Sequence, residues 1–286
     1  MAGQALYLKY RPQSFDEVVG QEAITRTLRN ALRQGRVRHA YLFTGTRGTG
    51  KTTMARLLAK AVNCLAPEDQ RPCNVCALCT ALNEGRLLDL IEIDAASNRG
   101  IDEIRDIREK VGFRPNEGRY KVYVLDEAHM LTEPAFNALL KTLEEPPPHV
   151  IFVLVTTDPQ KIPATIASRC QHFSFRSVEF EDVVALMRRI CASENIEAGD
   201  EVLAVLAQAG EGSVRDSLSA LDQAIACCGS QLRAADVRAL LGAFSLDSLG
   251  QVTEALATSD SRRMIELVAE LERNGHNLQH FCRELA

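Results

Sequence analysis

The sequence has no hydrophobic run long enough to cross a membrane, since none of its apolar stretches approaches about 20 residues. Its first residues, Met1-Ala2-Gly3-Gln4-Ala5, lack the charged segment and apolar core of a secretory signal. It also lacks a positive net charge, because 33 lysines and arginines face 38 aspartates and glutamates, which gives −5. These absences predict a cytoplasmic protein with no membrane partner, in which any contact with nucleic acid depends on a local basic surface.

The composition is that of an ordinary globular protein, with 46% hydrophobic and 25% charged residues. A length of 286 residues exceeds one typical domain, so we expect two or three domains. Nine cysteines are many for a cytosolic protein, whose thiols stay reduced. Four of them lie within one short stretch of the sequence. In a reducing compartment such clustering favours metal binding over disulfide formation.

The clearest motif is a phosphate-binding loop, G-x-x-x-x-G-K-T, which runs from Gly45 to Thr52. The run Tyr41-Leu42-Phe43 leads into it and a helical pattern of apolar residues follows, which is the strand–loop–helix context that the motif requires. Glycines allow backbone N–H groups to close around phosphate oxygens where the helix begins. The alternative is a glycine turn with a chance lysine, which the flanking strand and helix disfavour.

We expect residues of this loop to contact the phosphates of a nucleoside triphosphate and its Mg²⁺. Lys51 would reach the β- and γ-phosphates, and the Thr52 hydroxyl would ligate Mg²⁺. The residues predicted to contact the nucleotide here are Gly45, Thr46, Arg47, Gly48, Thr49, Gly50, Lys51, Thr52 and Thr53. We therefore expect the chain to bind a nucleoside triphosphate together with Mg²⁺.

The second strong signal is a run of apolar residues, Val122-Tyr123-Val124-Leu125, that ends in Asp126 and Glu127. This pattern describes a buried parallel strand whose carboxyl end carries chemistry. Asp126 would hold Mg²⁺, and Glu127 would orient and deprotonate an attacking water. The alternative, two acids that cap the following turn, is disfavoured once the phosphate loop is present. A further buried strand, 150–155, is followed by the polar run Thr156-Thr157-Asp158, where a polar residue can sense the γ-phosphate or the water.

The cysteine cluster has the spacing C-x8-C-x2-C-x2-C and consists of Cys64, Cys73, Cys76 and Cys79. Four thiolates can close a tetrahedral Zn²⁺ site, and the two-residue gaps let successive ligands reach one ion. Because the protein supplies all four zinc ligands, the predicted zinc is structural and stabilises an insert at about 64–79. The alternative is a set of unpaired thiols packed under the loop.

From Glu179 onward the sequence predicts helices and no further strands. Ser213 and Asp216 form an S-x-x-D capping box, which places Arg215 in the first turn of a helix. A third helical unit begins near residue 246 and buries too little surface to stand alone. We therefore expect the natural chain to continue past Ala286. The helices are expected at 180–193, 200–209, 214–226, 234–241, 246–257 and 262–271.

Taken together, these residues resemble the AAA+ ATPases and, within them, the bacterial clamp-loader ATPases of the DNA polymerase III gamma/tau family. The resemblance covers essentially the whole chain. It rests on the phosphate loop, the four-cysteine insert, V-Y-V-L-D-E-A-H, F-N-A-L-L-K-T-L-E-E-P-P, T-T-D-P-Q-K-I-P, S-R-C and G-S-V-R-D. The phosphate loop alone would indicate only a superfamily. The zinc insert, together with S-R-C and L-L-K-T-L-E-E-P-P, narrows the resemblance to this family.

The resemblance implies roles that the residues alone leave open. Thr157 matches the first sensor, Arg169 looks like the arginine finger that completes a neighbouring subunit's ATP site, and Arg215 looks like the second sensor. Without the resemblance, both arginines read as solvated side chains. The segment read on its own as a surface linker would flank the adenine through Arg11, Pro12, Val18 and Val19.

The resemblance also implies an architecture and a function. We expect an α/β AAA+ core at 1–178 with a parallel sheet flanked by helices, a small helical lid at 179–242, and the start of a helical collar at 243–286. The implied function is ATP hydrolysis, with Mg²⁺, in a hetero-oligomer of clamp-loader subunits that loads a sliding clamp onto primer–template DNA. The chain would be a component of the DNA polymerase III holoenzyme but not its polymerising subunit, because paired metal-binding aspartates on a palm-like sheet are missing.

Two other functions remain as alternatives. One is an AAA+ motor of another kind, such as a branch-migration helicase or an unfoldase, which the zinc insert and S-R-C disfavour. The other is a scaffold that binds nucleotide or partners without hydrolysis, which the intact Lys51, Thr52, Asp126 and Glu127 disfavour.

Overall fold

The computed structural model describes residues 4–98, 100–241, 246–273 and 282 of the chain. It divides into two compact units. The first consists of Met1–Val183 together with Gly212–Arg215, and the second of Val184–Glu211 together with Asp216–Ala286. No helix in the described part of the chain is both long enough and apolar enough to cross a membrane.

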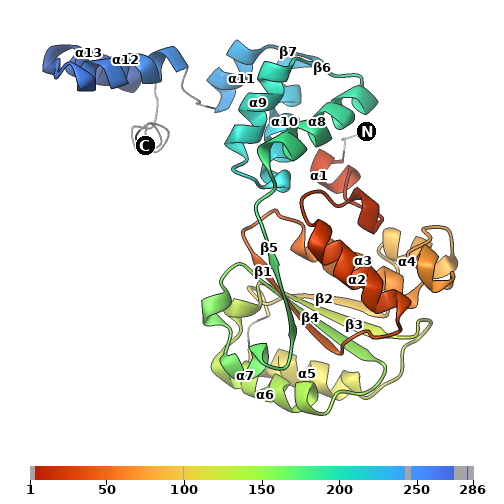
Figure 1. The fold of residues 1–286 in the computed structure, drawn as a ribbon. Helices are drawn as coiled ribbons and strands as arrows, with labels where there is room; N and C mark the ends of the chain where they lie inside the picture. Colours follow the sequence, from red (N-terminus) through yellow and green to blue (C-terminus); the bar gives the residue numbers. More distant parts are fainter. Residues whose placement is uncertain (1–3, 99, 242–245, 274–281, 283–286) are drawn as a thin grey trace. The chain divides into compact units, whose positions relative to one another are not determined.

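The first unit is built on a five-stranded sheet in the order β2-β3-β4-β1-β5 (Figure 1). All four strand pairs are parallel, so the expected parallel α/β sheet is confirmed. The strands are β1 (Ala40–Gly45), β2 (Leu90–Asp94), β3 (Lys121–Asp126), β4 (Val150–Thr156) and β5 (Gln171–Phe175). Thr44 of β1 pairs with Thr156, and Leu125 of β3 pairs with Leu154. The carboxyl ends of β1, β3 and β4 therefore lie at one edge of the sheet.

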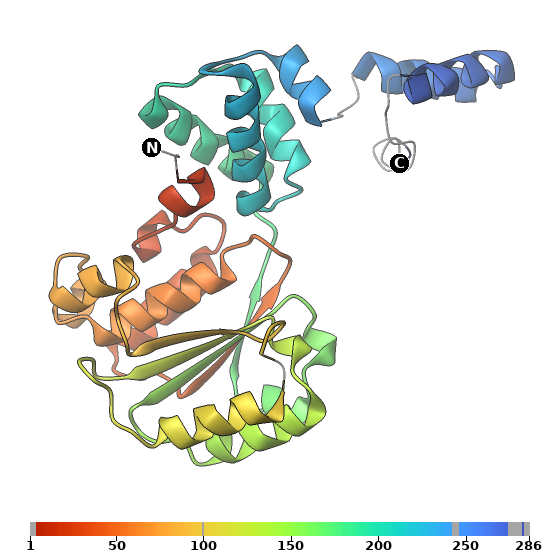
Figure 2. The same cartoon turned by 180° about the vertical axis from the view of Figure 1, so that it is seen from behind.

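Both faces of this sheet are buried, which explains the continuous apolar runs in its central strands. Along β3, Val122 and Val124 point into one core cluster, while Tyr123 and Leu125 point into the other, as the two-residue repeat of a strand requires. Helices α2 and α3 supply the first cluster, and α5 and α6 supply the second. Figure 1 and Figure 2 show these two pairs of helices on opposite faces of the sheet.

The helices of the first unit follow the apolar spacing of the sequence. Helix α6 ends just before Pro146-Pro147-Pro148, because proline cannot supply the N–H that continues a helix. The α-helices are α1 (Leu6–Lys9), α2 (Glu22–Arg33), α3 (Lys51–Asn63), α4 (Ala77–Asn83), α5 (Ile101–Val111), α6 (Glu133–Glu144) and α7 (Ala164–Ala167). Short 3-10 turns lie at η1 (Phe15–Glu17), η2 (Glu68–Gln70), η3 (Ala128–Met130) and η4 (Pro159–Lys161).

The second unit is helical, with one exception to the sequence prediction. Strands β6 (Glu197–Ala198) and β7 (Gln231–Leu232) form a parallel pair, so the expectation that strands cease after residue 179 was wrong. Two-residue strands are too short to show any alternation of apolar and polar residues, which is why the sequence does not reveal them. The α-helices between residues 180 and 241 are α8 (Phe180–Glu194), α9 (Asp200–Ala209), α10 (Val214–Cys228) and α11 (Ala234–Leu241).

The segment expected to begin a helical collar, 243–286, lies partly outside the described residues. Its described part forms α12 (Leu246–Ala257) and α13 (Ser261–Arg273). These two helices contact each other, and Val252, Ala255 and Leu267 are buried.

One buried carboxylate anchors the loop that leads into β3. Asp89 directly precedes β2, is fully buried, and accepts backbone N–H bonds from Asn116 at 2.7 Å, Glu117 at 2.8 Å and Gly118 at 2.7 Å. Burial alone raises the pKa of Asp89, but these bonds and nearby Lys121 outweigh it and hold the pKa below its ordinary value. The ionised form therefore stabilises the fold.

We expect Asp89→Asn to lower the free energy of unfolding by about 1–3 kcal/mol at neutral pH, because the charge-assisted bonds to three N–H groups are lost. Since the folded-state pKa is lowered, this stabilisation is present above the ordinary pKa of 3.8 and is lost as the pH falls through the lowered value. Urea unfolding at several pH values measures the gap between the two proteins. Asp102→Asn, at an exposed side chain, is the control, and equal stability of wild type and Asp89→Asn at pH 7 would contradict the prediction.

Candidate nucleotide site and cysteine cluster

The loop between β1 and α3 has a backbone that only glycine fits at its first position. Gly45 has φ 137°, and a Cβ placed on it would lie 2.3 Å from the carbonyl oxygen of Phe175 on the neighbouring strand β5. Gly50, with φ 98°, is left-handed and directly precedes Lys51, where α3 begins. A loop of this kind exposes backbone N–H groups at the positive end of a helix, which is where anions bind.

Lys51 lies within this loop rather than in solvent. Its side chain is buried, and its ammonium donates to the backbone oxygens of Gly45 at 2.9 Å and Thr46 at 2.6 Å. Burial lowers the pKa of Lys51, while the nearby Glu127 and Asp126 act against that shift. The loop therefore holds a cation at the place where the sequence predicts a phosphate.

Thr52 and Asp126 meet although they are far apart in the sequence. The Thr52 hydroxyl, in the first turn of α3, donates to Oδ2 of Asp126 at the end of β3 over 2.8 Å. Oδ1 of Asp126 accepts the backbone N–H of Glu127 at 2.9 Å. A hydroxyl oxygen next to a carboxylate fits Mg²⁺, which prefers oxygen ligands and binds through few protein groups.

Glu127 and Thr157 are also brought together. The Thr157 hydroxyl, just after β4, donates to Oε2 of Glu127 over 3.1 Å. Glu127 has a left-handed backbone, φ 48° and ψ 44°, which is uncommon for a residue with a Cβ and is found at functional sites. Neither residue is buried, so the carboxylate stays accessible to a water molecule.

One residue of this group, His129, was given no role by the sequence analysis. His129 lies with Nδ1 3.5 Å from Oε2 of Glu127 and 3.0 Å from the hydroxyl of Thr156. The same hydroxyl donates to the backbone oxygen of Asp158 over 3.1 Å. The signal for His129 was present in the sequence, since it stands two residues after Glu127 in the D-E-A-H run.

The four residues expected around the adenine lie in the segment that leads from α1 through η1 into α2. Arg11, Pro12, Val18 and Val19 are all half-buried. Burial lowers the pKa of Arg11, and the neighbouring guanidinium of Arg56 lowers it further.

Arg215 belongs to the first unit, together with 212–214. It contacts the same N-terminal segment. Its guanidinium lies over the ring of Tyr7, 4.9 Å from the ring centre. Arg11 is close enough to both Arg215 and Tyr7 to interact with them electrostatically. Tyr7 is a further residue that the sequence analysis missed, and a single tyrosine in a four-residue helix gave no signal.

Arg169 makes its contacts away from the phosphate loop. Its Nη2 pairs with Oε1 of Glu144 at the end of α6 over 2.6 Å, and its Nη1 donates to the backbone oxygen of Thr165 over 2.6 Å. The side chain is one-third exposed. The guanidinium is thus held at the surface by one carboxylate and one carbonyl.

The four cysteines of the insert converge. Their Sγ atoms all lie within 4.8 Å of one another, and the pairs Cys73–Cys79 and Cys76–Cys64 are each 4.0 Å apart. Tetrahedral thiolates around zinc at about 2.3 Å lie at a similar spacing. Cys64 accepts the N–H of Cys73 at 3.4 Å, and Cys73 accepts that of Cys76 at 3.3 Å, contacts that orient metal-bound sulfur. The donor set and its geometry fit zinc.

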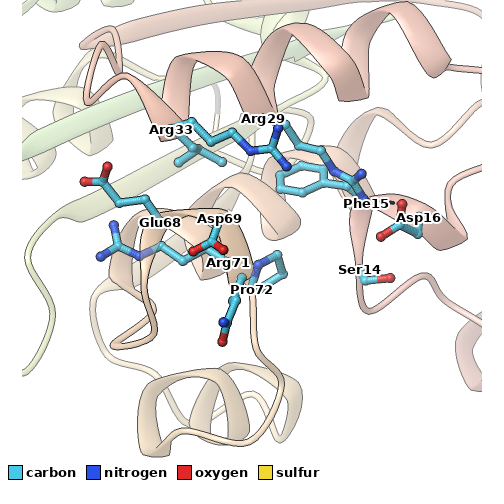
Figure 3. Close-up of a pocket in the computed structure, with 11 residues that line it drawn as sticks. Ser14, Phe15, Asp16, Arg29, Arg33, Glu68, Asp69, Arg71 and Pro72 are labelled. Atoms are coloured by element: carbon cyan, nitrogen blue, oxygen red, sulfur yellow. Dashed lines mark ion pairs between the residues drawn. The ribbon is translucent and has the colours of Figure 1, made fainter.

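A pocket of about 260 Å³ lies between the insert and the N-terminal segment (Figure 3). One wall is formed by 14–16 with Arg29, which pairs with Asp16 at 2.5 Å and lies over the ring of Phe15. The opposite wall is formed by 68–72 of the insert. Its lining carries both signs of charge, so the pocket favours no class of ligand.

Two family models match the chain. Residues 20–179 match the model described as "DNA polymerase III, delta subunit", and residues 182–230 match "DNA polymerase III clamp loader subunit, ATPase lid domain". The chain is 51% identical to DNA polymerase III subunit tau of Bacillus subtilis over 276 residues, 96% of this chain and 49% of that one. It is 47% identical to the tau subunit of Escherichia coli over 275 residues, 96% of this chain and 43% of that one. The chain therefore spans about half the length of these relatives or less.

Among solved structures, the chain is similar to the Thermotoga maritima RuvB Holliday junction branch migration motor. The TM-score is 0.61 at 17% identity, over 88% of this chain and 80% of that one. Identity this low shows a shared fold and no more.

We expect Gly45→Ala to lower the free energy of unfolding by about 1–3 kcal/mol more than Gly35→Ala does, because a backbone oxygen of β5 cannot swing away from the added methyl group. Gly35 is the matched control, since it also has a positive φ, 62°, but no atom within 4 Å of the added Cβ. Urea unfolding of both variants checks this, and equal losses of stability would contradict it.

Proposed function

The chain belongs to the gamma/tau family of DNA polymerase III clamp-loader subunits, and on this premise we propose that it binds ATP at the loop between β1 and α3 and hydrolyses it there. The observation that carries the proposal is the convergence of Lys51, the Thr52–Asp126 pair and the Thr157–Glu127 pair at one edge of the sheet. These contacts join the ends of β1, β3 and β4 to the start of α3.

Each residue then has a task that its contacts support. Lys51 leaves the carbonyls of Gly45 and Thr46 for the β- and γ-phosphates, and the loop's backbone N–H groups cradle the remaining oxygens. Thr52 and Asp126 hold Mg²⁺, which neutralises charge on the phosphate oxygens when bound. Both contacts of the Glu127 carboxylate go to Oε2, from Thr157 and His129, so Oε1 is free to accept the proton of the attacking water.

We expect Glu127→Gln to keep ATP binding and to lower turnover by about 100-fold or more, since the amide cannot accept the proton of the water. Fluorescence titration with a nucleotide analogue measures binding, and phosphate release measures turnover. Glu145→Gln, at an exposed glutamate at the end of α6, is the control and keeps both. Turnover of Glu127→Gln near the wild-type rate would remove Glu127 from the role of base.

Two arginines complete the site in this proposal. Arg215 senses the γ-phosphate, which its place beside Tyr7 and Arg11 supports. Arg169 acts on the ATP of a neighbouring subunit, as its surface position away from its own loop supports. Phosphoryl transfer builds negative charge that a guanidinium supplied in trans stabilises, so hydrolysis depends on assembly.

In the complete assembly, we expect Arg169→Ala to lower turnover by about 1,000-fold or more at the sites that it serves, because the charge of the transition state loses its partner. Lys51→Ala abolishes a subunit's own site but leaves its Arg169 available to the next subunit. Mixing the two variants should therefore recover part of the turnover that neither shows alone. If both variants assemble and the mixture stays inactive, Arg169 does not act in trans.

We further propose that the metal of the four cysteines is a structural zinc. Cys64 ends the phosphate helix α3 and Cys79 lies in α4, so one ion would fix the insert to the helix that begins at Lys51. All four ligand positions belong to the protein, which leaves no place for a catalytic water.

Elemental analysis of freshly purified protein should find one zinc per chain. Cys79→Ser removes a buried ligand and should lower both the zinc content and the unfolding temperature. Cys227→Ser, at an exposed cysteine outside the cluster, is the control and should change neither. Zinc-free wild-type protein would contradict the proposal.

At the level of the whole assembly, we propose a motor subunit of the clamp loader of DNA polymerase III. It would act in the cytoplasm in a hetero-oligomer, use ATP to open a sliding clamp, and release the closed clamp on primer–template DNA. The relatives at 42–51% identity favour this over a branch-migration motor, because the likeness to RuvB extends only to the fold. The intact Lys51, Asp126 and Glu127 favour it over a scaffold that does not hydrolyse ATP.

A further inference from the structure

Lys60 is a buried cation that the reaction at the phosphate loop does not use. It lies in α3, nine residues after Lys51, and is only 2% exposed. Its ammonium donates to four oxygens, two of them on Gln13, at 3.0 Å for the backbone oxygen and 2.8 Å for Oε1. The others are Oδ1 of Asn74 at 2.8 Å and Oδ1 of Asn83 at 2.6 Å. A buried charge is costly unless hydrogen bonds satisfy it, and here all the bonded acceptors are neutral.

These oxygens belong to separate parts of the first unit. Asn74 stands between Cys73 and Cys76 in the cysteine loop and has a left-handed backbone, φ 61°. Asn83 ends α4, the helix that carries the ligand Cys79. Gln13 belongs to the N-terminal segment, directly after Arg11-Pro12. One ammonium on the phosphate helix therefore joins the metal insert to the segment expected beside the adenine.

The connection continues from Gln13 to the backbone of that segment. Nε2 of Gln13 donates to the backbone oxygen of Arg11 over 3.1 Å, while its Oε1 accepts from Lys60. The backbone N–H of Gln13 donates to Oε2 of Glu17 over 2.8 Å, and the Ser14 hydroxyl donates to Oε1 of Glu17 over 2.9 Å. A continuous path of hydrogen bonds thus runs from Asn74 through Lys60 and Gln13 to Arg11.

The pocket of Figure 3 lies between the same two segments, the insert and the N-terminal segment. It separates the wall at 14–16 from the wall at 68–72, and the Arg29–Asp16 ion pair stays on the N-terminal side. The hydrogen bonds of Lys60 lie where the insert and the N-terminal segment do connect. Loss of the metal would release Asn74 and Asn83 first, since they lie in the loop and at the end of the helix that the cysteines fix.

We propose that Lys60 couples the metal insert to the adenine side of the nucleotide site. Metal bound by the four cysteines fixes the positions of Asn74 and Asn83. Through their hydrogen bonds, Lys60 and Gln13 then fix the position of the backbone at Arg11. The insert then strengthens nucleotide binding from a distance, and bound nucleotide raises the affinity for the metal by the same factor, because coupling between two binding equilibria is reciprocal. The inference rests on the proposed ATP and zinc sites, and Lys60 acts through Gln13 as a positioning residue.

The test is a thermodynamic cycle on the full-length protein with two readouts. The first is the Kd of a fluorescent, slowly hydrolysed ATP analogue with Mg²⁺, measured with zinc bound and after its removal by a chelator under reducing conditions. The second is the Kd of zinc, measured by competition with a chelating dye of known affinity, with and without the analogue. In the wild type, zinc removal should raise the Kd of the analogue about fivefold or more, and the analogue should lower the Kd of zinc by the same factor.

Lys60→Met keeps the length of the side chain but removes its donors, so it should bind the analogue more weakly and lose both dependences. Gln13→Met leaves Lys60 with Asn74, Asn83 and the backbone oxygen of residue 13, but it removes the side-chain link to Arg11. It serves as the second variant should Lys60→Met fail to fold. Lys141→Met, at an exposed lysine on α6, is the matched control and should behave as the wild type.

The outcomes separate the coupling from the function on which it rests. A wild-type protein that does not bind the analogue overturns the proposed ATP site itself. A wild type that binds the analogue equally well with and without zinc, and binds zinc with the same Kd with and without the analogue, overturns the coupling alone. Full coupling in both Lys60→Met and Gln13→Met would show that it takes another route and would overturn the role of Lys60.

Discussion

The arrangement of this protein depends on a geometric constraint of its sheet, which is that three parallel strands end at one edge. The register pairs Thr44 with Thr156 and Leu125 with Leu154, so the carboxyl ends of β1, β3 and β4 stop together. Because β1 runs directly into the phosphate loop, Thr52 lies within hydrogen-bonding distance of Asp126, and Glu127 lies within reach of Thr157. A shift of one residue in any of these pairings would turn the polar ends toward the opposite face of the sheet.

Much of this arrangement could be predicted from the sequence, because the residues involved sit in strong local patterns. The G-x-x-x-x-G-K-T loop needs a strand before it and a helix after it, and the apolar run that ends in Asp126 describes a buried parallel strand. Cysteines spaced by two residues can reach one ion without help from the rest of the fold.

What could not be predicted depends on contacts between distant segments. The sequence shows Lys60 as one of several polar residues in α3, and nothing in its neighbourhood reveals that Gln13, Asn74 and Asn83 meet at its ammonium. The strands β6 and β7 are too short to carry a periodic signal, and their pairing is set by the helices that bring residues 197 and 231 together. His129 was visible in a motif, but its contact with Thr156 depends on the register of β3 and β4.

In the proposed mechanism, one chain supplies most of the catalytic residues of its ATP site, and a neighbouring subunit supplies the remaining arginine. Lys51, Asp126 and Glu127 lie together at the phosphate loop, whereas Arg169 of the same unit is held at the surface by Glu144. On this view the free subunit turns ATP over slowly, and assembly around a clamp and DNA brings each guanidinium to the next site.

The most direct measurement is ATP turnover of the full-length protein in its complete assembly, with and without the sliding clamp and primer–template DNA. We expect turnover to rise when both are added, and turnover that stays unchanged with both present would contradict a clamp-loader motor.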